Sequence, residues 1–385
     1  MADAEAKNDL EFMAQAIELG RKGIYSTRPN PAVGCVIVKD GRVIASGWHR
    51  KAGQPHAEIE ALKNASESVE GATVYVTLEP CSHMGKTPPC ADALVVAKVA
   101  RVVVAMQDPN PLVAGQGIER LRQAGIKVDV GLLESDARQL NQGFIRAMSQ
   151  GLPYVRLKVA ASLDGRTAMK NGESQWITGE EARSQVQLMR ARHGAIVTGI
   201  GTVLADDPSL TVRLPKDQLQ SLGLTEETCQ PIRVVLDAHL SMPLEAKMLS
   251  LDGRTILMTS KESAQENPDL VEKLYQAGAE VVAVAAEEER LDIESVLRYL
   301  HEEEQIRDVM VEAGSIVAGA FVQSGLVNEI HAFFAPILMG DQAKPMFSLL
   351  NMHHMADKVS LDFQSVTMVG QDVYAILKPS GLPQG

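Results

Sequence analysis

Short runs of β-branched residues alternate with stretches whose apolar residues recur at helical spacing, and this alternation limits the chain to α/β folds. A helix is predicted at 11–23, and predicted strands at 32–38 and 42–49 are joined by Asp40-Gly41, a dipeptide typical of hairpin turns. Further strands are predicted at 73–79, 101–106 and 127–133, and helices at 56–65, 90–100, 117–125 and 134–150. One hairpin followed by β/α alternation predicts a three-layer α/β/α sandwich with a mixed sheet.

The alternation is interrupted once, at 149–155, where Gly151 and Pro153 end a helical stretch. It then resumes, with strands predicted at 195–200, 232–238, 255–260, 280–285, 308–314 and 329–337, and helices at 179–194, 268–278 and 293–303. A chain of 385 residues is too long for one ordinary hydrophobic core. The sequence therefore predicts two α/β domains, at 1–150 and 151–385.

Charge and composition narrow the class of protein. The formal net charge is −12 and no run of five basic residues occurs, which disfavours nucleic acid as the main partner. No apolar run approaches the roughly 20 residues that cross a bilayer, and the acidic first twenty residues do not resemble a targeting signal. Four cysteines are too few for a disulfide scaffold in a chain of this length. We therefore expect a cytoplasmic protein with neither nucleic acid nor membrane as a partner.

Three residues in two fragments, GQPHAEIEA (53–61) and LEPCSHMGKTPPC (78–90), have the chemistry of zinc ligands. They are His56, Cys81 and Cys90. Zinc binds imidazole nitrogen and thiolate sulfur tetrahedrally, and catalytic sites keep one position open for water. Cys90 begins a predicted helix, whose positive end favours a thiolate. The three residues therefore predict a zinc site with an open fourth position.

Glu58 lies two residues after His56, a spacing that places side chains on opposite sides of an ideal helix. The two can share a site only where a helix begins, and Pro55 predicts that start. Zinc lowers the pKa of a bound water, and a carboxylate beside the metal can pass protons to a departing amine. The motif therefore predicts hydrolytic deamination by zinc-activated water, with Glu58 as the catalytic acid and base.

Two other interpretations of these residues stay open. The zinc site could be architectural, with Cys35 or His83 as a fourth ligand, or two core thiols could lie beside a surface histidine without metal. Cys35 lies in an apolar strand, where a free thiol is usually a small hydrophobic group. The eight residues between Cys81 and Cys90 also depart from the usual two in deaminases, which indicates a narrower class.

Four segments together resemble the pyrimidine deaminase domain of the bifunctional riboflavin-biosynthesis family RibD, in which the loop between the cysteines is lengthened in the same way. They are RPNPAVGCVIV (28–38), GWHRKAGQPHAE (47–58), VTLEPCSHMGKTPPC (76–90) and DPNPLVAGQG (108–117). The resemblance implies a cytidine deaminase-like fold. It also implies that the substrate is 2,5-diamino-6-(5-phosphoribosylamino)pyrimidin-4-one, which loses its 2-amino group to give 5-amino-6-(5-phosphoribosylamino)uracil.

The same resemblance implies contacts with that substrate. It places Asn30 at the pyrimidine edge, where an amide can both donate and accept, and it places His49, His83 and Lys86 near the ribose phosphate. Asn30 could instead be only a turn residue between two prolines, and His83 and Lys86 could be plain solvated side chains.

Without any resemblance to a family, the sequence of the second half predicts only an α/β domain that binds a nucleotide. The usual G-x-G-x-x-G dinucleotide motif is absent. In VEAGSIVAGA (311–320) a predicted strand ends at Glu312 and a helix opens after Gly314, which suits a cofactor pyrophosphate. Ordinary packing of a helix on a sheet explains such glycines equally well. GIGTVLADDP (199–208) is expected to be a turn joined to an acidic loop.

The second half also resembles the reductase domain of the same family, through KVAASLDGRTA (158–168), GESQWITGEEAR (172–183) and GIGTVLADDPSLTVR (199–213). This implies a dihydrofolate reductase-like fold. It further implies that NADPH delivers hydride to the anomeric carbon of the ribosyl arm, giving 5-amino-6-(5-phosphoribitylamino)uracil. The implied cofactor positions are Ala160, Trp176, Thr202, Asp206, Ala238, Gly314, Ser315, Ile316, Val317, Ala318, Gly319 and Ala320.

The implied positions for the reductase substrate are Lys158, Ser174, Arg190, Leu210, Arg213 and Glu312. Arg190 and Arg213 would grip the 5-phosphate, because guanidinium binds phosphate through two parallel hydrogen bonds. Lys158 and Glu312 would lie close to the reacting sugar, with Asp164 as support. Without the resemblance, a lone Arg190 would be taken for an exposed charge on an amphipathic helix.

Two alternative functions compete with this bifunctional enzyme. One is a stand-alone nucleobase, nucleoside or tRNA deaminase with an unrelated second domain, although a tRNA enzyme should carry a basic face. The other is a non-enzymatic nucleotide-binding protein with a structural zinc, which would have no use for Glu58. The resemblance also implies small phosphorylated pyrimidines as partners and a homo-oligomer formed through the second domain.

Overall fold

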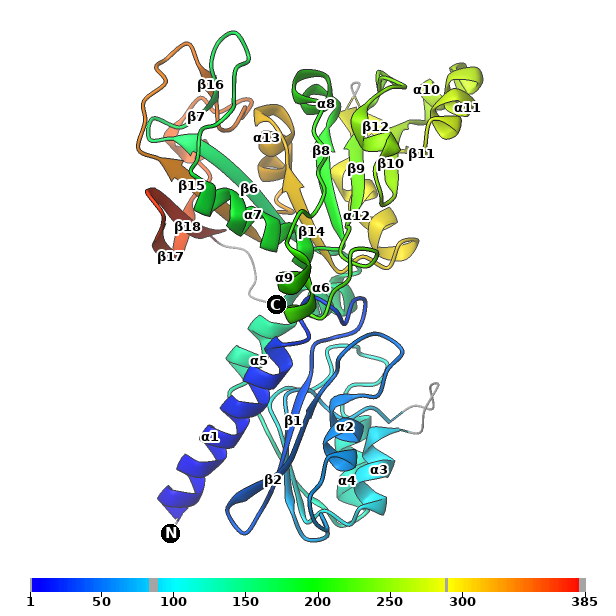
Figure 1. The fold of residues 1–385 in the computed structure, drawn as a ribbon, viewed down its shortest axis with the longest axis vertical. Coiled ribbons are helices and arrows are strands. Elements are labelled where there is room, and N and C mark those ends of the chain that lie inside the picture. Colours follow the sequence, from blue (N-terminus) through cyan, green and yellow to red (C-terminus); the bar gives the residue numbers. More distant parts are fainter. Residues whose placement is uncertain (1, 83–88, 288–289, 381–385) are drawn as a thin grey trace. The chain divides into compact units, whose positions relative to one another are not determined.

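The computed structural model describes residues 2–82, 89–287 and 290–380, without the side chains of residues 2–6. The chain divides into two compact units (Figure 1). The first contains the residues up to Gly151 together with Asp217–Leu224, and the second contains Leu152–Lys216 and the residues from Thr225 onward. No helix in these described ranges is long and apolar enough to cross a bilayer.

The first unit contains a five-stranded mixed sheet in the order β2-β1-β3-β4-β5. Its strands are β1 (Gly34–Lys39), β2 (Arg42–Trp48), β3 (Thr73–Val76), β4 (Arg101–Val104) and β5 (Lys127–Val130). β1 and β2 form the expected antiparallel hairpin, and Asp40 and Gly41 both have positive φ at its turn (49° and 73°). β3, β4 and β5 run parallel, so their carboxyl ends lie at one edge of the sheet.

Helices cover both faces of this sheet, with α1 and α5 on one side and α2, α3 and α4 on the other (Figure 1). The helices are α1 (Ala2–Arg21), α2 (Ala57–Lys63), α3 (Cys90–Val96), α4 (Gln116–Gln123), α5 (Glu134–Leu140) and α6 (Gln142–Gln150). The single helix predicted at 134–150 is wrong, because the chain breaks at Asn141. The Asn141 amide instead exchanges two hydrogen bonds with the backbone of Ala32, at 2.8 and 2.9 Å. The three-layer sandwich itself is confirmed.

The second unit contains a nine-stranded sheet in the order β11-β10-β9-β8-β14-β6-β15-β18-β17. Its strands are β6 (Tyr154–Ser162), β8 (Ala195–Gly199), β9 (Ile232–Leu236), β10 (Thr255–Ser260), β11 (Ala279–Val284), β14 (Asp308–Glu312), β15 (Glu329–Ala335), β17 (Leu361–Val369) and β18 (Asp372–Pro379). All run parallel except β17 and β18. β14, late in the chain, lies between the early strands β6 and β8.

Two hydrophobic cores lie on opposite faces of this sheet. α12 and α13 pack on one face with Val155, Leu157 and Val159 of β6, and α7 packs on the other. The helices of this unit are α7 (Glu180–Arg192), α8 (Ile200–Asp206), α10 (Lys261–Glu266), α11 (Pro268–Gln276), α12 (Ile293–Glu302) and α13 (Ser315–Gln323). A further helix, α9 (Lys216–Ser221), belongs to the first unit except for its first residue. Because strand side chains alternate, Arg156, Lys158 and Ala160 face α7.

The smaller elements are two two-stranded sheets, β7 (Arg166–Ala168) with β16 (Lys344–Pro345) and β12 (Ala286–Glu287) with β13 (Arg290–Leu291), and two 3₁₀ turns, η1 (Lys247–Ser250) and η2 (Met355–Asp357). The turn and acidic loop expected at 199–208 is wrong for most of its length, because residues 200–206 form α8 with Gly199 at its N-cap.

Candidate active sites

His56, Cys81 and Cys90 come together at the carboxyl edge of the first sheet. His56 is the extended N-cap of α2, Cys81 follows β3, and Cys90 is the first residue of α3. His56 Nδ1 lies 3.6 Å from Cys81 Sγ and 3.4 Å from Cys90 Sγ. Tetrahedral zinc, with Zn–S about 2.3 Å and Zn–N about 2.0 Å, sets such atoms roughly 3.6 Å apart. The donor atoms therefore have the identity and spacing that zinc requires.

The two sulfurs interact strongly with each other. The Cys90 N–H donates to Cys81 Sγ at 3.3 Å. The hydrogen bond from the Cys90 thiol lowers the pKa of Cys81, while the same bond and burial raise the pKa of Cys90. A bound divalent cation would allow both sulfurs to be thiolates.

The alternative of a closed site with Cys35 finds no support in the geometry. In the ranges that the structure describes, the only cluster of three or more potential metal ligands is His56, Cys81 and Cys90. Cys35 is fully buried in β1, and burial raises the pKa of its thiol. His83, the other proposed fourth ligand, lies outside the described residues.

Glu58 is in the first turn of α2, where its side chain can approach His56 because the helix starts between them. The carboxyl is 3% exposed and hydrogen-bonds to the thiol of Cys90. Burial raises the pKa of Glu58 to about 7. A carboxyl group with a pKa near neutrality can both accept and release a proton, which a general acid and base must do.

Asn30 and His49 lie side by side near this cluster. The Asn30 amide Nδ2 donates to His49 Nε2 at 3.2 Å, and His49 Nδ1 donates to the carbonyl of Pro55 at 3.0 Å. The His49 ring also meets that of His56 edge-on, at 5.4 Å between centroids. Both ring nitrogens of His49 are thus engaged with protein atoms. Its predicted phosphate contact stays a prediction, as do those of His83 and Lys86, which lie outside the described residues.

In the second unit, Lys158 and Glu312 are neighbours in register on β6 and β14. Lys158 Nζ lies 3.3 Å from Glu312 Oε1. Arg190, in the last turn of α7, makes two hydrogen bonds to the same carboxylate, both 2.9 Å long. Burial alone would raise the pKa of Glu312, but Arg190 and Lys158 outweigh it and lower the pKa to about 2. Three charged groups predicted from different segments therefore form one site.

The other predicted substrate residues have different surroundings. Arg190 is 8% exposed and also donates to the Thr211 carbonyl at 3.0 Å, so its guanidinium is occupied within the chain and is not an exposed charge. Arg213 is exposed, while Leu210 is buried with a positive φ of 48°. Ser174 Oγ lies 3.4 Å from Asp206 Oδ1.

The predicted cofactor residues lie on several elements. The Gly314 N–H, at the N-cap of α13, donates to Thr202 Oγ1 of α8 at 3.2 Å, which joins two of the predicted segments. Ile316 is exposed, but Ala318 and Gly319 are buried within α13. A Cβ at Gly319 would lie 2.1 Å from the Ser348 carbonyl oxygen, so close backbone packing accounts for that glycine.

The remaining cofactor positions are spread around the same unit. Ala160 lies on β6, Ala238 follows β9, and Trp176 is largely exposed with the Arg183 guanidinium 4.7 Å from its ring. Asp164, the predicted support, accepts hydrogen bonds from Ser162 and from the backbone of Met339 and Gly340. It therefore connects the β6–β7 turn to the loop after β15.

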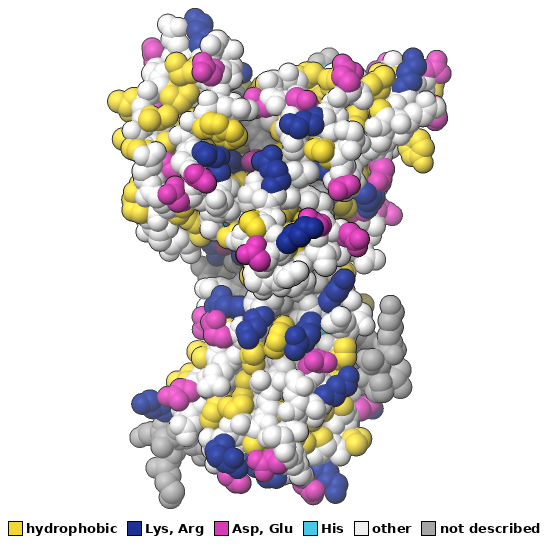
Figure 2. Space-filling view, viewed as in Figure 1, with side chains coloured by type: hydrophobic (Ala, Val, Ile, Leu, Met, Phe, Trp, Pro, Cys, Tyr) yellow, Lys and Arg dark blue, Asp and Glu magenta, His cyan; other side chains and the backbone are white. Residues whose placement is uncertain are grey.

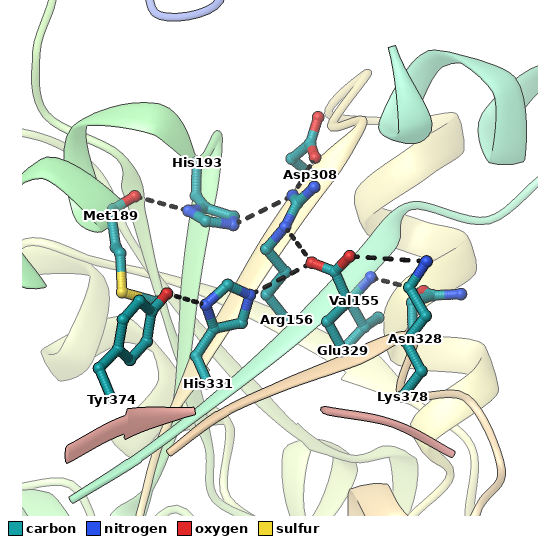
Figure 3. Close-up of polar contacts among 10 residues, drawn as sticks. All are labelled: Val155, Arg156, Met189, His193, Asp308, Asn328, Glu329, His331, Tyr374 and Lys378. Carbon is teal, nitrogen blue, oxygen red and sulfur yellow. Dashed lines mark hydrogen bonds and ion pairs between the residues drawn. The ribbon is translucent and has the colours of Figure 1, made fainter. Parts of the chain in front are cut away.

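A buried polar cluster on the same sheet face was missed by sequence reasoning (Figure 3). Arg156, 2% exposed, contacts Asp308 at 2.5 Å and Glu329 at 3.0 Å. Glu329 also contacts His331, whose other ring nitrogen lies 2.6 Å from the Tyr374 hydroxyl. The available signal was a second charged residue, Arg156, beside Lys158 in a strand that is mostly apolar.

His193 connects this cluster to α7. Its Nδ1 donates to the Met189 carbonyl at 2.6 Å, so Nε2 must be the acceptor that faces Arg156 at 3.4 Å (Figure 3). Burial lowers the pKa of His193 well below its usual value, with the Arg156 charge adding to the effect. The neutral ring therefore holds the end of α7, which carries Arg190, against β6, which carries Lys158.

Comparisons with known proteins assign both units. Residues 6–106 match the family described as cytidine and deoxycytidylate deaminase zinc-binding region, and residues 153–375 match the RibD C-terminal domain. The riboflavin biosynthesis protein RibD of Escherichia coli is 47% identical over 95% of this chain and 98% of its own length. The RibD protein of Bacillus amyloliquefaciens is 44% identical over 94% of this chain and 94% of its own length.

Solved structures agree. RibD of Acinetobacter baumannii, 47% identical, superposes with a TM-score of 0.88 over 97% of this chain and 99% of its own. A Thermotoga maritima protein is 34% identical and superposes with a TM-score of 0.83 over 97% of this chain and 99% of its own. It is named a diaminohydroxyphosphoribosylaminopyrimidine deaminase/5-amino-6-(5-phosphoribosylamino)uracil reductase. These matches span both halves and exclude a stand-alone deaminase with an unrelated second domain. The chain belongs to the RibD family of riboflavin biosynthesis proteins and is a bifunctional enzyme that joins a zinc-binding deaminase domain to a reductase domain.

Proposed function

We propose that the first unit deaminates 2,5-diamino-6-(5-phosphoribosylamino)pyrimidin-4-one and that the second reduces the resulting 5-amino-6-(5-phosphoribosylamino)uracil with NADPH. The Thermotoga maritima relative is named for this pair of reactions and aligns with nearly the whole chain. The observation that carries the proposal is the gathering of His56, Cys81 and Cys90 beside buried Glu58, in a chain whose second half matches the RibD C-terminal domain.

For deamination, His56 Nδ1 and the two thiolates would hold zinc, which when bound lowers the pKa of a water. Glu58, buried beside these ligands, would take up a proton and pass it to the departing amine. The amide of Asn30 is oriented by His49, and His49 by the Pro55 carbonyl. Asn30 can therefore present a fixed amide to the pyrimidine edge.

For reduction, NADPH would lie along the exposed start of α13, near Thr202, Asp206 and Trp176, and would supply the hydride. Lys158 and Glu312, which contact each other, would flank the sugar, and we assign Lys158 as the proton donor. Arg213, exposed near the start of α9, is the guanidinium that we assign to the phosphate. Arg190 instead holds Glu312 in place.

Zinc removal is the first test of this assignment. Prolonged dialysis against a chelator should abolish release of ammonia from the diaminopyrimidinone, because the three donor atoms alone cannot activate water. Consumption of NADPH with the deaminated substrate should remain, since the predicted reductase residues all lie in the other unit. Zinc content per chain and both rates are measured before dialysis, after it and after zinc is restored. Deamination that survives complete loss of zinc would contradict the proposal.

We also propose a homo-oligomer that forms through the second unit. β17 is an edge strand, and hydrophobic side chains lie on the surface at this edge (Figure 2). Phe363, Val366 and Met368 are 67%, 58% and 63% exposed. A long exposed apolar edge strand is normally covered by another chain.

The substitution Val366→Asp is accordingly expected to shift the protein to the monomer, as measured by light scattering over a range of concentrations. Thr367→Asp is the matched control, because neighbouring strand residues point to opposite faces. The same mass for wild type and Val366→Asp would argue against this surface.

A cytoplasmic location is part of the proposal as well. Cys81 and Cys90 have free thiols, and the zinc site needs both as thiolates, which a reducing compartment preserves. Cell fractionation followed by immunodetection tests it, and recovery of the protein outside the cytoplasmic fraction would contradict it.

A further inference from the structure

Glu79 is a buried carboxylate two residues before the zinc-ligand candidate Cys81. Its side chain is 6% exposed. It accepts four backbone N–H groups, from Asp108 at 3.0 Å and Gly115 at 2.9 Å through Oε2, and from Gly117 at 2.8 Å and Ile118 at 3.2 Å through Oε1. All four donors lie between the end of β4 and the first turn of α4. One side chain therefore ties this segment to the strand end that carries Cys81.

These hydrogen bonds replace water around the carboxylate. Burying a charged group is costly unless it is paired or hydrogen-bonded. Among the described residues, none of the ion pairs includes Glu79, so the four amides are the donors that stabilise it. Hydrogen bonds to an ionised acceptor are stronger than those between neutral groups. The arrangement is specific for a carboxylate, since an amide in its place would bring a donor NH₂ against backbone N–H groups.

A second contact joins the same two segments. A Cβ at Gly117 would lie 1.9 Å from the carbonyl oxygen of Pro80, the residue just before Cys81. Only glycine allows α4 to approach the Pro80-Cys81 peptide this closely. The first turn of α4 is therefore packed directly against the backbone that places the Cys81 sulfur.

α4 also fixes the second thiol. Arg120 of α4 donates to Asp92 of α3 at 2.8 Å, and the buried side chains of Leu94 and Leu121 belong to the same core. α3 begins with Cys90, whose N–H donates to the Cys81 sulfur. Both sulfur-bearing segments are thus supported by α4, while His56 comes from α2.

We propose that Glu79 is the positioning residue of the metal centre: by holding the start of α4 against Pro80, it keeps the Cys81 sulfur at the distance from His56 and Cys90 that zinc requires. This inference rests on the proposed zinc-dependent deaminase. Groups that orient metal ligands without touching the metal typically change metal affinity by roughly 10- to 100-fold when they are replaced.

The test is the substitution Glu79→Gln in the full chain. Its zinc affinity, measured by competition with a chromogenic chelator, is expected to fall roughly 10- to 100-fold. The visible spectrum of the cobalt-substituted protein should also change, because it reports the geometry of the ligands. NADPH oxidation with the deaminated substrate should equal that of wild type, because the predicted reductase residues lie in the other unit.

Arg101→Gln is the control for a merely structural role. Arg101 bridges Asp9 and Asp129 at the start of β4, at the opposite end of the sheet from Cys81. The Arg101→Gln substitution should lower the thermal stability of the same unit and leave its zinc affinity unchanged. Gly117→Ala reaches the site by the other contact and should weaken zinc in the same way as Glu79→Gln.

The outcomes are distinct. Wild-type zinc affinity in both Glu79→Gln and Gly117→Ala would overturn this inference but leave the proposed deaminase standing. The same would follow if Arg101→Gln lost as much zinc affinity as Glu79→Gln. If Glu79→Gln does not accumulate as a chain with reductase activity, Gly117→Ala decides by the same measurement. A wild-type chain that binds no zinc would overturn the proposed deaminase site itself.

Discussion

Glu58→Gln is expected to reduce the turnover number of deamination by roughly 10²- to 10⁴-fold, the contribution that a positioned acid and base usually makes. Glutamine has the same shape but cannot take up and release a proton. The buried carboxyl, with its pKa raised to about 7, is suited to both steps. Zinc content should stay at the wild-type level, because Glu58 is not among the three gathered ligands. Ammonia release and metal analysis of the same preparation are the measurements.

Two further variants control this experiment. Glu60→Gln changes a carboxylate of the same helix that instead pairs with Arg50 at 3.6 Å, and it should deaminate normally. Cys90→Ser should lose both zinc and deamination. If Glu58→Gln turns over as fast as wild type, the proton-transfer role belongs to another group.

Glu312→Gln is expected to reduce the turnover number of the reductase by on the order of 100-fold or more, since small displacements of reacting groups have effects of that size. The carboxylate balances Lys158 and Arg190, all three being largely buried. Its loss leaves two cations facing each other, and both will move. NADPH oxidation measures the effect, while deamination in the same chain should be unchanged.

Glu280→Gln is the matched control, because that carboxylate pairs with Arg254 at the surface of the same unit. The lowered pKa of Glu312 also predicts a pH dependence. The stabilisation that it provides is complete above its ordinary value of 4.5 and is lost as pH falls towards about 2. Glu312 should therefore contribute no titration to the reductase profile between roughly pH 5 and 9. A full rate in Glu312→Gln would show that Lys158 and Arg190 keep their places without it.

The features that the sequence predicted well are those set by neighbouring residues. Asp40-Gly41 forms the hairpin turn because both residues adopt positive φ there. Pro55 precedes the start of α2, and that start allows His56 and Glu58 to share one site. The zinc-ligand candidates were found because their residue types are rare and chemically distinctive, and the structure brings their donor atoms together.

The features that were missed depend on distant segments. The break at Asn141 follows from its bonds to Ala32, more than a hundred residues away. β17 was not predicted because a bulge between Phe363 and Ser365 interrupts its apolar alternation. The contacts of Arg190 and Lys158 with Glu312 require β14 to lie beside β6, and sequence order does not reveal that placement.

The polar cluster around Arg156 has a consequence for how such a protein can diverge. Removing one member of a buried charged set typically costs about 3–5 kcal/mol, whereas exchanging the whole set for apolar residues is often neutral. Arg156, Asp308, Glu329 and His331 should therefore be inherited as a block, since every single-step route away from the cluster passes through an unstable intermediate. Among descendants of this sequence, these positions should change together or not at all.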